Sequence, residues 1–101
     1  MNAEDSFSLT ETAKMLDIFG FGRNRLIRFL REEGILQANN VAKKCYVDRG
    51  YFRVIRVRYY TDGGALRVKR ETRVREKGVR YIRQRLDAYL RNFMDNAMMR
   101  Y

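Results

Sequence analysis

The spacing of apolar residues changes twice along this chain, and that pattern limits the folds open to it. Apolar side chains first recur at helical spacing, then alternate as they do in strands, and finally return to helical spacing near the carboxyl end. Short helices, a hairpin and a long helix together are typical of an α+β domain. The chain has 101 residues, which is enough for one compact domain and too few for two ordinary ones.

The first helical segment begins with a capping box. In the tetrapeptide that starts at Ser8, the Ser8 hydroxyl can accept a hydrogen bond from the Glu11 amide, and the Glu11 carboxylate can accept one from the Ser8 amide. The apolar residues that follow predict a short helix over 9–16. Residues 1–7 are expected to form a polar lead.

A second helix is predicted from Arg23 to Glu33, because its apolar residues fill one arc of a helical wheel. Gly34 is well placed to end it, since glycine tolerates the left-handed conformation that often follows a helix. Residues 17–22 form a glycine-containing connection, so the two helices are a candidate helix-turn-helix. The polar arc of the second helix carries Asn24, Arg25, Arg28 and Arg31.

The end charges of the second helix run against its macrodipole. Arg23 and Arg25 lie in its first turn, whereas two glutamates lie in its last. Arginines at a helix amino terminus are favourable where they bind a phosphate together with the backbone N–H groups. Alternatively, pairing of Arg28 with Glu32 and simple hydration would remove the unfavourable effect of these end charges on the helix. Both interpretations stay open at this point.

The middle of the chain predicts a loop and a β-hairpin. Asparagines and a glycine mark turns within residues 35–50, which are expected to form a loop. Dense β-branched and aromatic residues predict strands over 51–60 and 66–74, joined by a turn at 61–64. Alternation is clean in the second strand and imperfect in the first, which predicts a bulge or burial on both faces there.

The last segment has helical periodicity and predicts a long helix over 76–98. The first half of its apolar stripe is expected to pack on the domain. The second half is expected to form the contact of a homodimer. The residues of that contact are Tyr89, Leu90, Phe93 and Ala97.

The formal net charge of +10 is carried mostly by the second half of the chain. Residues 1–50 contain eight basic and seven acidic side chains, whereas residues 51–101 contain fourteen basic and five acidic ones. A small basic domain favours a polyanion as its partner, usually a nucleic acid, because fixed positive charges displace counterions from phosphates. The alternative is a hydrated basic surface. A membrane partner is not expected, because the basic residues gather on the predicted strands rather than along one helix face.

Composition argues against several classes of site. The chain has no histidine and a single cysteine, Cys45, so we expect no metal site, no intrachain disulfide and no cofactor. Cys45 is expected to be a free, partly buried thiol. Without histidine we expect no enzyme activity and no small-molecule substrate. No apolar run approaches the length of a membrane helix and the start lacks a signal-peptide pattern, so a soluble cytoplasmic protein is expected.

Several motifs of the chain resemble one known family. They are SLTETAKMLDI, FGRNRLIRFLREEGIL, the pair NN, YVDRGYF and T-x-V-x-x-K-G-x-x-Y-I, the last running from Thr72 to Ile82. In this order, from about Phe7 to Leu86, they resemble the KilA carboxyl-terminal (KilAC) domain of phage antirepressor proteins. The resemblance implies a phage or prophage protein in the cytoplasm of a bacterial host. It places a KilAC-like domain over 8–86 and a helical extension over 87–101.

Two functions are consistent with these observations. In the first, the domain is a winged helix-turn-helix that binds double-stranded DNA, with its second helix in the major groove and the hairpin as a basic wing. Base contacts are then expected from Asn24, Arg25, Arg28 and Arg31. Phosphate contacts are expected from Lys14, Arg23, Lys43, Lys44, Arg53, Arg56, Arg58, Arg67, Lys69, Arg70 and Arg73. In the second, the domain binds and inactivates a phage lysogeny repressor without reading DNA itself.

Overall fold

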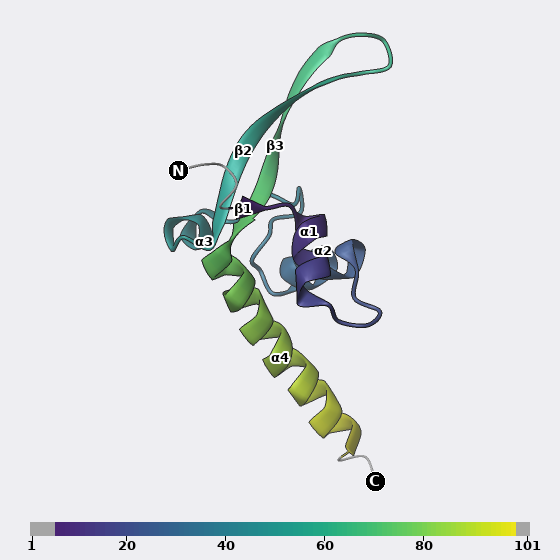
Figure 1. The fold of residues 1–101 in the computed structure, drawn as a ribbon, viewed down its shortest axis with the longest axis vertical. Coiled ribbons are helices and arrows are strands. Elements are labelled where there is room, and N and C mark those ends of the chain that lie inside the picture. Colours follow the sequence, from purple (N-terminus) through teal and green to yellow (C-terminus); the bar gives the residue numbers. More distant parts are fainter. Residues whose placement is uncertain (1–5, 99–101) are drawn as a thin grey trace.

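The computed structural model describes residues 6–98, and it describes side chains as far as Asn92. These residues form a small three-stranded sheet and four helices (Figure 1). In chain order the elements are β1 (Ser6–Phe7), α1 (Leu9–Leu16), α2 (Arg23–Glu32), α3 (Lys44–Asp48), β2 (Phe52–Tyr60), β3 (Leu66–Arg75) and α4 (Glu76–Met98). The α+β class predicted from the spacing of apolar residues is confirmed.

The capping box at the start of α1 is confirmed. The Glu11 amide donates to the Ser8 hydroxyl at 3.0 Å, and the Ser8 amide donates to the Glu11 carboxylate at 2.8 Å. Two amide groups that the helix itself leaves unpaired are therefore satisfied. These bonds hold the pKa of Glu11 below its ordinary value, chiefly through the bond from the Ser8 amide.

The end of α2 is confirmed to within one residue. Gly34 adopts a left-handed conformation with φ +76°, and its amide donates to the carbonyl of Arg31. The next amide, that of Ile35, donates to the carbonyl of Leu30 at 2.9 Å. These two bonds make a Schellman motif, which sends the chain sharply away from the axis of α2.

The strands pair antiparallel in the order β1-β3-β2. Every residue of β2 has a partner in β3, from Phe52 with Val74 at the base to Tyr60 with Leu66 at the tip. The expected bulge in the first strand is therefore wrong. Burial on both faces is only partial and lies near the base, where Val54 on one face and Ile55 on the other are half-buried, while Phe52 alone is fully buried. The physical reason is that the outer part of the hairpin leaves the core, so burial does not dictate its pattern (Figure 1).

Two elements differ from the expectations. The end of the expected polar lead forms β1, in which Ser6 pairs with Arg75 and Phe7 with Val74. The expected loop over 35–50 contains α3 and an isolated bridge between Leu36 and Ala42. Both elements are very short, and α3 has no side-chain cap, so neither carries a periodic signal.

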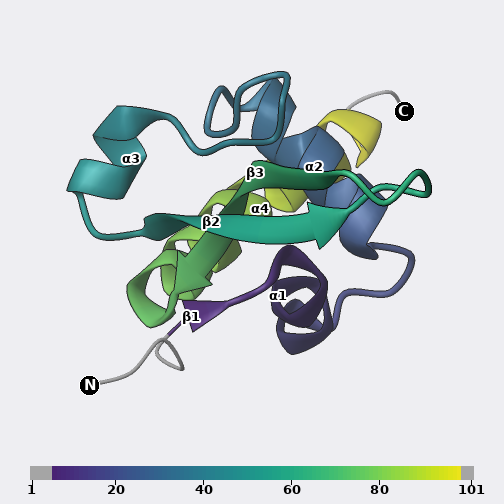
Figure 2. The same ribbon diagram turned by 90° about the horizontal axis from the view of Figure 1, so that it is seen from above.

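The core lies between α1, α2, the first half of α4 and the base of the hairpin. In Figures 1 and 2, α3 lies across the hairpin base from α1 and α2. The hairpin and the second half of α4 extend in opposite directions, and the longest axis measures 58 Å (Figure 1). The most deeply buried apolar residues are Leu26, Leu30, Ile35, Phe52, Val74, Ile82 and Leu86.

Candidate nucleic-acid interface

The polar arc of α2 lines a hollow of about 440 Å³. The apolar side chains of α2 are buried, so the core fixes which side chains turn outward; they are Leu26, Ile27, Phe29 and Leu30. The structure thus brings together all the side chains that were predicted to contact bases. The hollow is lined by Arg23, Asn24, Arg25, Ile27, Arg28, Arg31 and Asn40.

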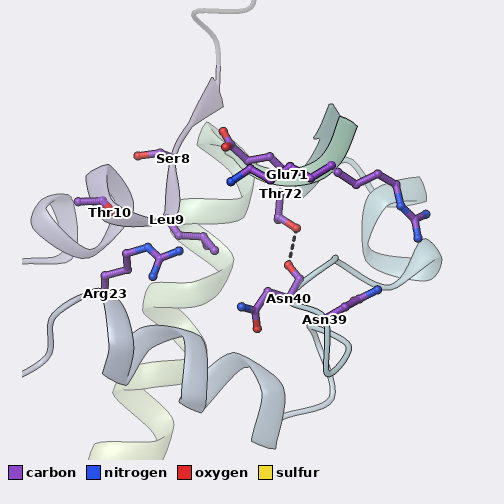
Figure 3. A pocket seen from close by; sticks show the side chains of 10 residues that line it. Ser8, Leu9, Thr10, Arg23, Asn39, Asn40, Glu71 and Thr72 are labelled. Carbon is purple, nitrogen blue, oxygen red and sulfur yellow. Dashed lines mark hydrogen bonds between the residues drawn. The ribbon is translucent and has the colours of Figure 1, made fainter. Parts of the chain in front are cut away.

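A second hollow, of about 420 Å³, lies between the start of α1, the turn before α3 and the inner part of β3 (Figure 3). Arg23 and Asn40 line both hollows, so the two are neighbours. Lys69 and Arg70 add positive charge from the hairpin, and Glu71 adds a carboxylate. We call the two hollows together the basic groove.

The turn at 39–40 was expected only as part of a loop, yet it forms the middle of the basic groove. Asn40 is left-handed with φ 67°, and the Asn39 side chain accepts from the Val41 amide at 3.0 Å. The Thr72 hydroxyl donates to the Asn40 carbonyl at 2.7 Å (Figure 3). The same hydroxyl accepts from the Ala42 amide at 3.2 Å. The pair of asparagines indicates a turn in the sequence, but no local pattern indicates that Thr72 of β3 holds this turn.

The side chain of Asn40 leaves one acceptor unused. Its Oδ1 is buried and has no hydrogen-bond partner among the described residues. An unpaired buried acceptor costs about 1–3 kcal/mol. The left-handed backbone itself is ordinary for an asparagine in a turn, because its short polar side chain tolerates that conformation.

The arginines of α2 lack carboxylate partners. Within the described part of the chain, no salt bridge involves Arg23, Arg25 or Arg28. The pairing of Arg28 with Glu32 that would have neutralised the helix ends is therefore not formed. These exposed arginines repel one another across the hollow, and a bound polyanion would relieve that repulsion.

The glutamate at the end of α2 has a different partner. Glu33 accepts from Arg85 of α4 at 2.6 Å, and Arg85 also donates to the Tyr81 hydroxyl at 3.1 Å. The bond with Glu33 raises the pKa of Arg85. This pair attaches the carboxyl end of α2 to α4, so Glu33 stabilises the packing of the helices rather than the face of α2.

The other predicted phosphate contacts are spread more widely. Lys14 on α1 and Lys43 and Lys44 at α3 are exposed but line neither hollow. Arg73 is half-buried and donates to the Ser6 carbonyl at 2.9 Å, so it ties β3 to β1. Arg53, its cross-strand partner, is also half-buried. The remaining candidates, Arg56, Arg58 and Arg67, are exposed along the outer hairpin.

A third hollow is apolar and was not predicted. It measures about 560 Å³ and lies between the connection after α1, one side of α2 and the middle of α4. Phe19 on its rim is fully exposed, and Phe29 packs against Tyr89 with ring centroids 5.2 Å apart. The phenylalanines beside the glycines at 19–22 are the signal that could have indicated it. Arg25 and Arg28 line both this apolar groove and the basic groove.

The predicted homodimer contact lies partly at this apolar groove. Tyr89 and Leu90 line it. Phe93 and Ala97 belong to α4, but their side chains lie outside the described residues. Self-association through this end of α4 stays a prediction.

Comparison with known proteins gives a family match over most of the chain. The family described as the phage antirepressor protein KilAC domain matches residues 1–89. The chain belongs to the KilAC family. The earlier resemblance, drawn from the motifs over 7–86, is thereby confirmed.

Two curated proteins are similar to this KilAC domain. Protein kilA of Escherichia phage P1 is 37% identical over 73 residues, which are 68% of this chain and 27% of that protein. The SPbeta prophage-derived protein YoqD of Bacillus subtilis (strain 168), provisionally named as an antirepressor, is 33% identical over 85 residues, or 81% of this chain and 32% of that protein. The KilAC domain thus spans about a third or less of either relative. No solved structure matches it significantly.

Three further features of the KilAC domain bear on the expectations. Among the described residues, no helix has the length and apolar character needed to cross a membrane. Within the same residues, no three metal-ligating side chains gather into a cluster. Cys45 is exposed, so the expectation of a partly buried thiol is wrong, because the short helix α3 buries none of its residues.

Proposed function

We propose that this KilAC domain binds double-stranded DNA through the basic groove, with α2 in the major groove. In this proposal α1 and α2 are the helix-turn-helix, and β2 and β3 are its wing. The single observation that carries the proposal is the arc of arginines on α2. They line one hollow, they are exposed, and no carboxylate pairs with Arg23, Arg25 or Arg28 in the described residues.

The types of side chain in the groove fit the two kinds of DNA contact. Arg25, Arg28 and Arg31 can donate two hydrogen bonds to the edge of a guanine, and Asn24 can pair with an adenine. Arg23 lies at the amino terminus of α2, where free backbone N–H groups and a guanidinium suit a phosphate. Gly22 caps this helix without a side chain, so the amide groups at its end stay open to a ligand.

The test is a binding series on duplex DNA at several salt concentrations. About five phosphate contacts give a slope of log K against log salt of about −4 to −5. Arg28→Ala should weaken specific binding about tenfold or more, because it removes a base contact worth about 1–3 kcal/mol.

Arg80→Ala is the matched control, since Arg80 is an exposed helical arginine that lines neither part of the basic groove. Both variants lose one positive charge. Equal weakening by the two would contradict the placement of α2, and a flat salt response would contradict DNA binding altogether.

Binding to a repressor protein is the second candidate function. The apolar groove favours it, because Phe19 is fully exposed there beside Phe29 and Tyr89. Phe19→Ser should then abolish capture of the repressor that the domain opposes while leaving DNA affinity unchanged. Capture that survives this substitution would remove the apolar groove as the docking site.

A further inference from the structure

The outer part of the hairpin is largely exposed in the part of the chain that the structure describes. We call residues 56–70 the hairpin arm. It points away from α4, and its tip leans to the side of the molecule on which α2 lies (Figures 1 and 2). All of its residues are exposed except Val57 and Thr61, which are half-buried. The residues that hold the hairpin in the core, Phe52, Thr72 and Val74, all lie closer to the base.

Apolar side chains gather at the tip of the hairpin arm. Tyr60 and Leu66 are direct cross-strand partners next to the turn, and they are 74% and 52% exposed. Val68 lies on the same face of β3 as Leu66 and is 57% exposed. Three exposed apolar side chains on one face give this tip a surface that could contact another molecule.

The face that carries this tip continues into the basic groove. Alternation along β3 puts Leu66, Val68, Arg70 and Thr72 on one side of the ribbon. Arg70 and Thr72 of this face line the basic groove together with Lys69 and Glu71 of the other face, and Thr72 of this face contacts Asn40. A molecule that is bound along α2 in the basic groove can therefore extend onto this face of the hairpin arm.

The charge of the hairpin arm favours DNA as that molecule. Residues 56–70 contain five basic side chains and one carboxylate, Asp62. A second copy of this chain, with its own net charge of +10, is a poor partner for such a surface. A phosphate backbone is a good one, because binding releases its counterions.

The length of the hairpin arm matches the distance between neighbouring grooves. Thr72 and Leu66 are six positions apart along β3, which is about 20 Å at ~3.4 Å per residue. One turn of DNA is ~34 Å long, so the major groove and the next minor groove are about half a turn, or about 17 Å, apart along the axis. Apolar side chains have no partner on phosphates, but in the minor groove they insert between base pairs and bend the duplex.

We propose that the hairpin arm lies in the minor groove next to α2 and that Tyr60 and Leu66 insert together at a base step there, bending the DNA. This inference rests on the proposed function of the basic groove. The step is expected to be flexible, such as TA or CA, because such steps cost least to kink. The arm's arginines neutralise phosphates on either side of the bend.

The test measures bending of a duplex of about 30 base pairs, labelled at both ends for energy transfer, by the full chain. Wild type should shorten the distance between the ends. Tyr60→Ser should abolish most of that change and weaken binding about tenfold, and Leu66→Ser should act in the same direction. A drug that fills the minor groove, such as distamycin, should compete with wild type and much less with Tyr60→Ser.

Tyr59→Ser is the matched control. Tyr59 is the same side chain one position earlier on β2, on the opposite face, where Lys69 lies over its ring at 5.5 Å. It should bend DNA as wild type does. Equal effects of Tyr59→Ser and Tyr60→Ser on bending would overturn the inference, and so would a bound duplex that stays straight. A failure of the proposed function gives a different result from a failure of this inference. In that case wild type shows no salt-dependent DNA binding, or Arg28→Ala binds DNA no more weakly than Arg80→Ala.

Discussion

The hydroxyl of Thr72 donates a hydrogen bond of 2.7 Å to the backbone carbonyl of Asn40. The same hydroxyl accepts from the Ala42 amide at 3.2 Å, and Thr72 is 3% exposed. One side chain of β3 thereby holds the turn that lies between α2 and the hairpin. The width of the basic groove depends on this contact, because Asn40 lines both of its hollows.

Thr72→Val should destabilise the domain by about 1–3 kcal/mol, because it keeps the shape of the side chain while leaving the part-buried Asn40 carbonyl and the buried Ala42 amide unpaired. Urea unfolding monitored by circular dichroism measures this. Thr72→Ser is the control that keeps the hydroxyl, and it should lose only the smaller contribution of a buried methyl group. A valine variant as stable as wild type would mean that the turn is held by its own bonds.

Arg23→Ala should weaken DNA binding by a similar factor for all sequences and reduce the salt slope by about 1, because Arg23 is expected to contact a phosphate. Arg80→Ala removes the same charge from α4, outside the basic groove, and should leave the slope nearly unchanged. Filter binding at several salt concentrations measures both. Equal changes in slope would show that only total charge matters.

The capping box should make the free energy of unfolding depend on pH in the range below the ordinary pKa of a glutamate. The pKa of Glu11 is lowered in the folded state, so its contribution is complete above the unfolded pKa and is lost as pH falls through the folded pKa. Wild type should therefore be more stable than Glu11→Gln near neutral pH, and the difference should vanish in acid. Thermal unfolding at a series of pH values checks this. A difference that does not change with pH would contradict the role of the carboxylate charge.

Gly78→Ala should be destabilising although alanine favours helices. A Cβ at this position would collide with the carbonyl oxygen of Tyr51, which accepts from the Arg75 amide at 3.0 Å. Overpacking of this kind costs about 1–3 kcal/mol, more than the gain of about 1 kcal/mol in helix propensity. Gly63→Ala, in the exposed hairpin turn with space around it, is the control and should change stability little in the same denaturation experiment.

Local signals explain where the sequence predicted the structure well. The capping box at Ser8, the terminating Gly34 and the helical period of α4 all act within a few residues of the chain. The arc of arginines on α2 was predictable for the same reason, since burial of Leu26 and Leu30 on the opposite face determines which side chains turn outward.

Long-range contacts explain where the sequence was insufficient. Arg70 and Arg73 look alike in the sequence, yet Arg70 lines the basic groove while Arg73 binds Ser6 of β1. Glu33, predicted as a charge at the wrong end of its helix, is paired with Arg85 of α4. Nothing local to these residues indicates the partners, which come from distant segments.

The sequence by itself determined the helices, the hairpin and the charged face of α2, because periodicity, capping and turn preferences depend on neighbouring residues. Only the tertiary structure decided that the turn at Asn40 and the β3 residues Arg70 and Thr72 meet α2 to form one groove. It also decided that the outer hairpin leaves the core with Tyr60 and Leu66 exposed. The physical reason is that packing joins residues far apart in the chain, and a pattern of apolar and charged residues does not specify which distant faces come together.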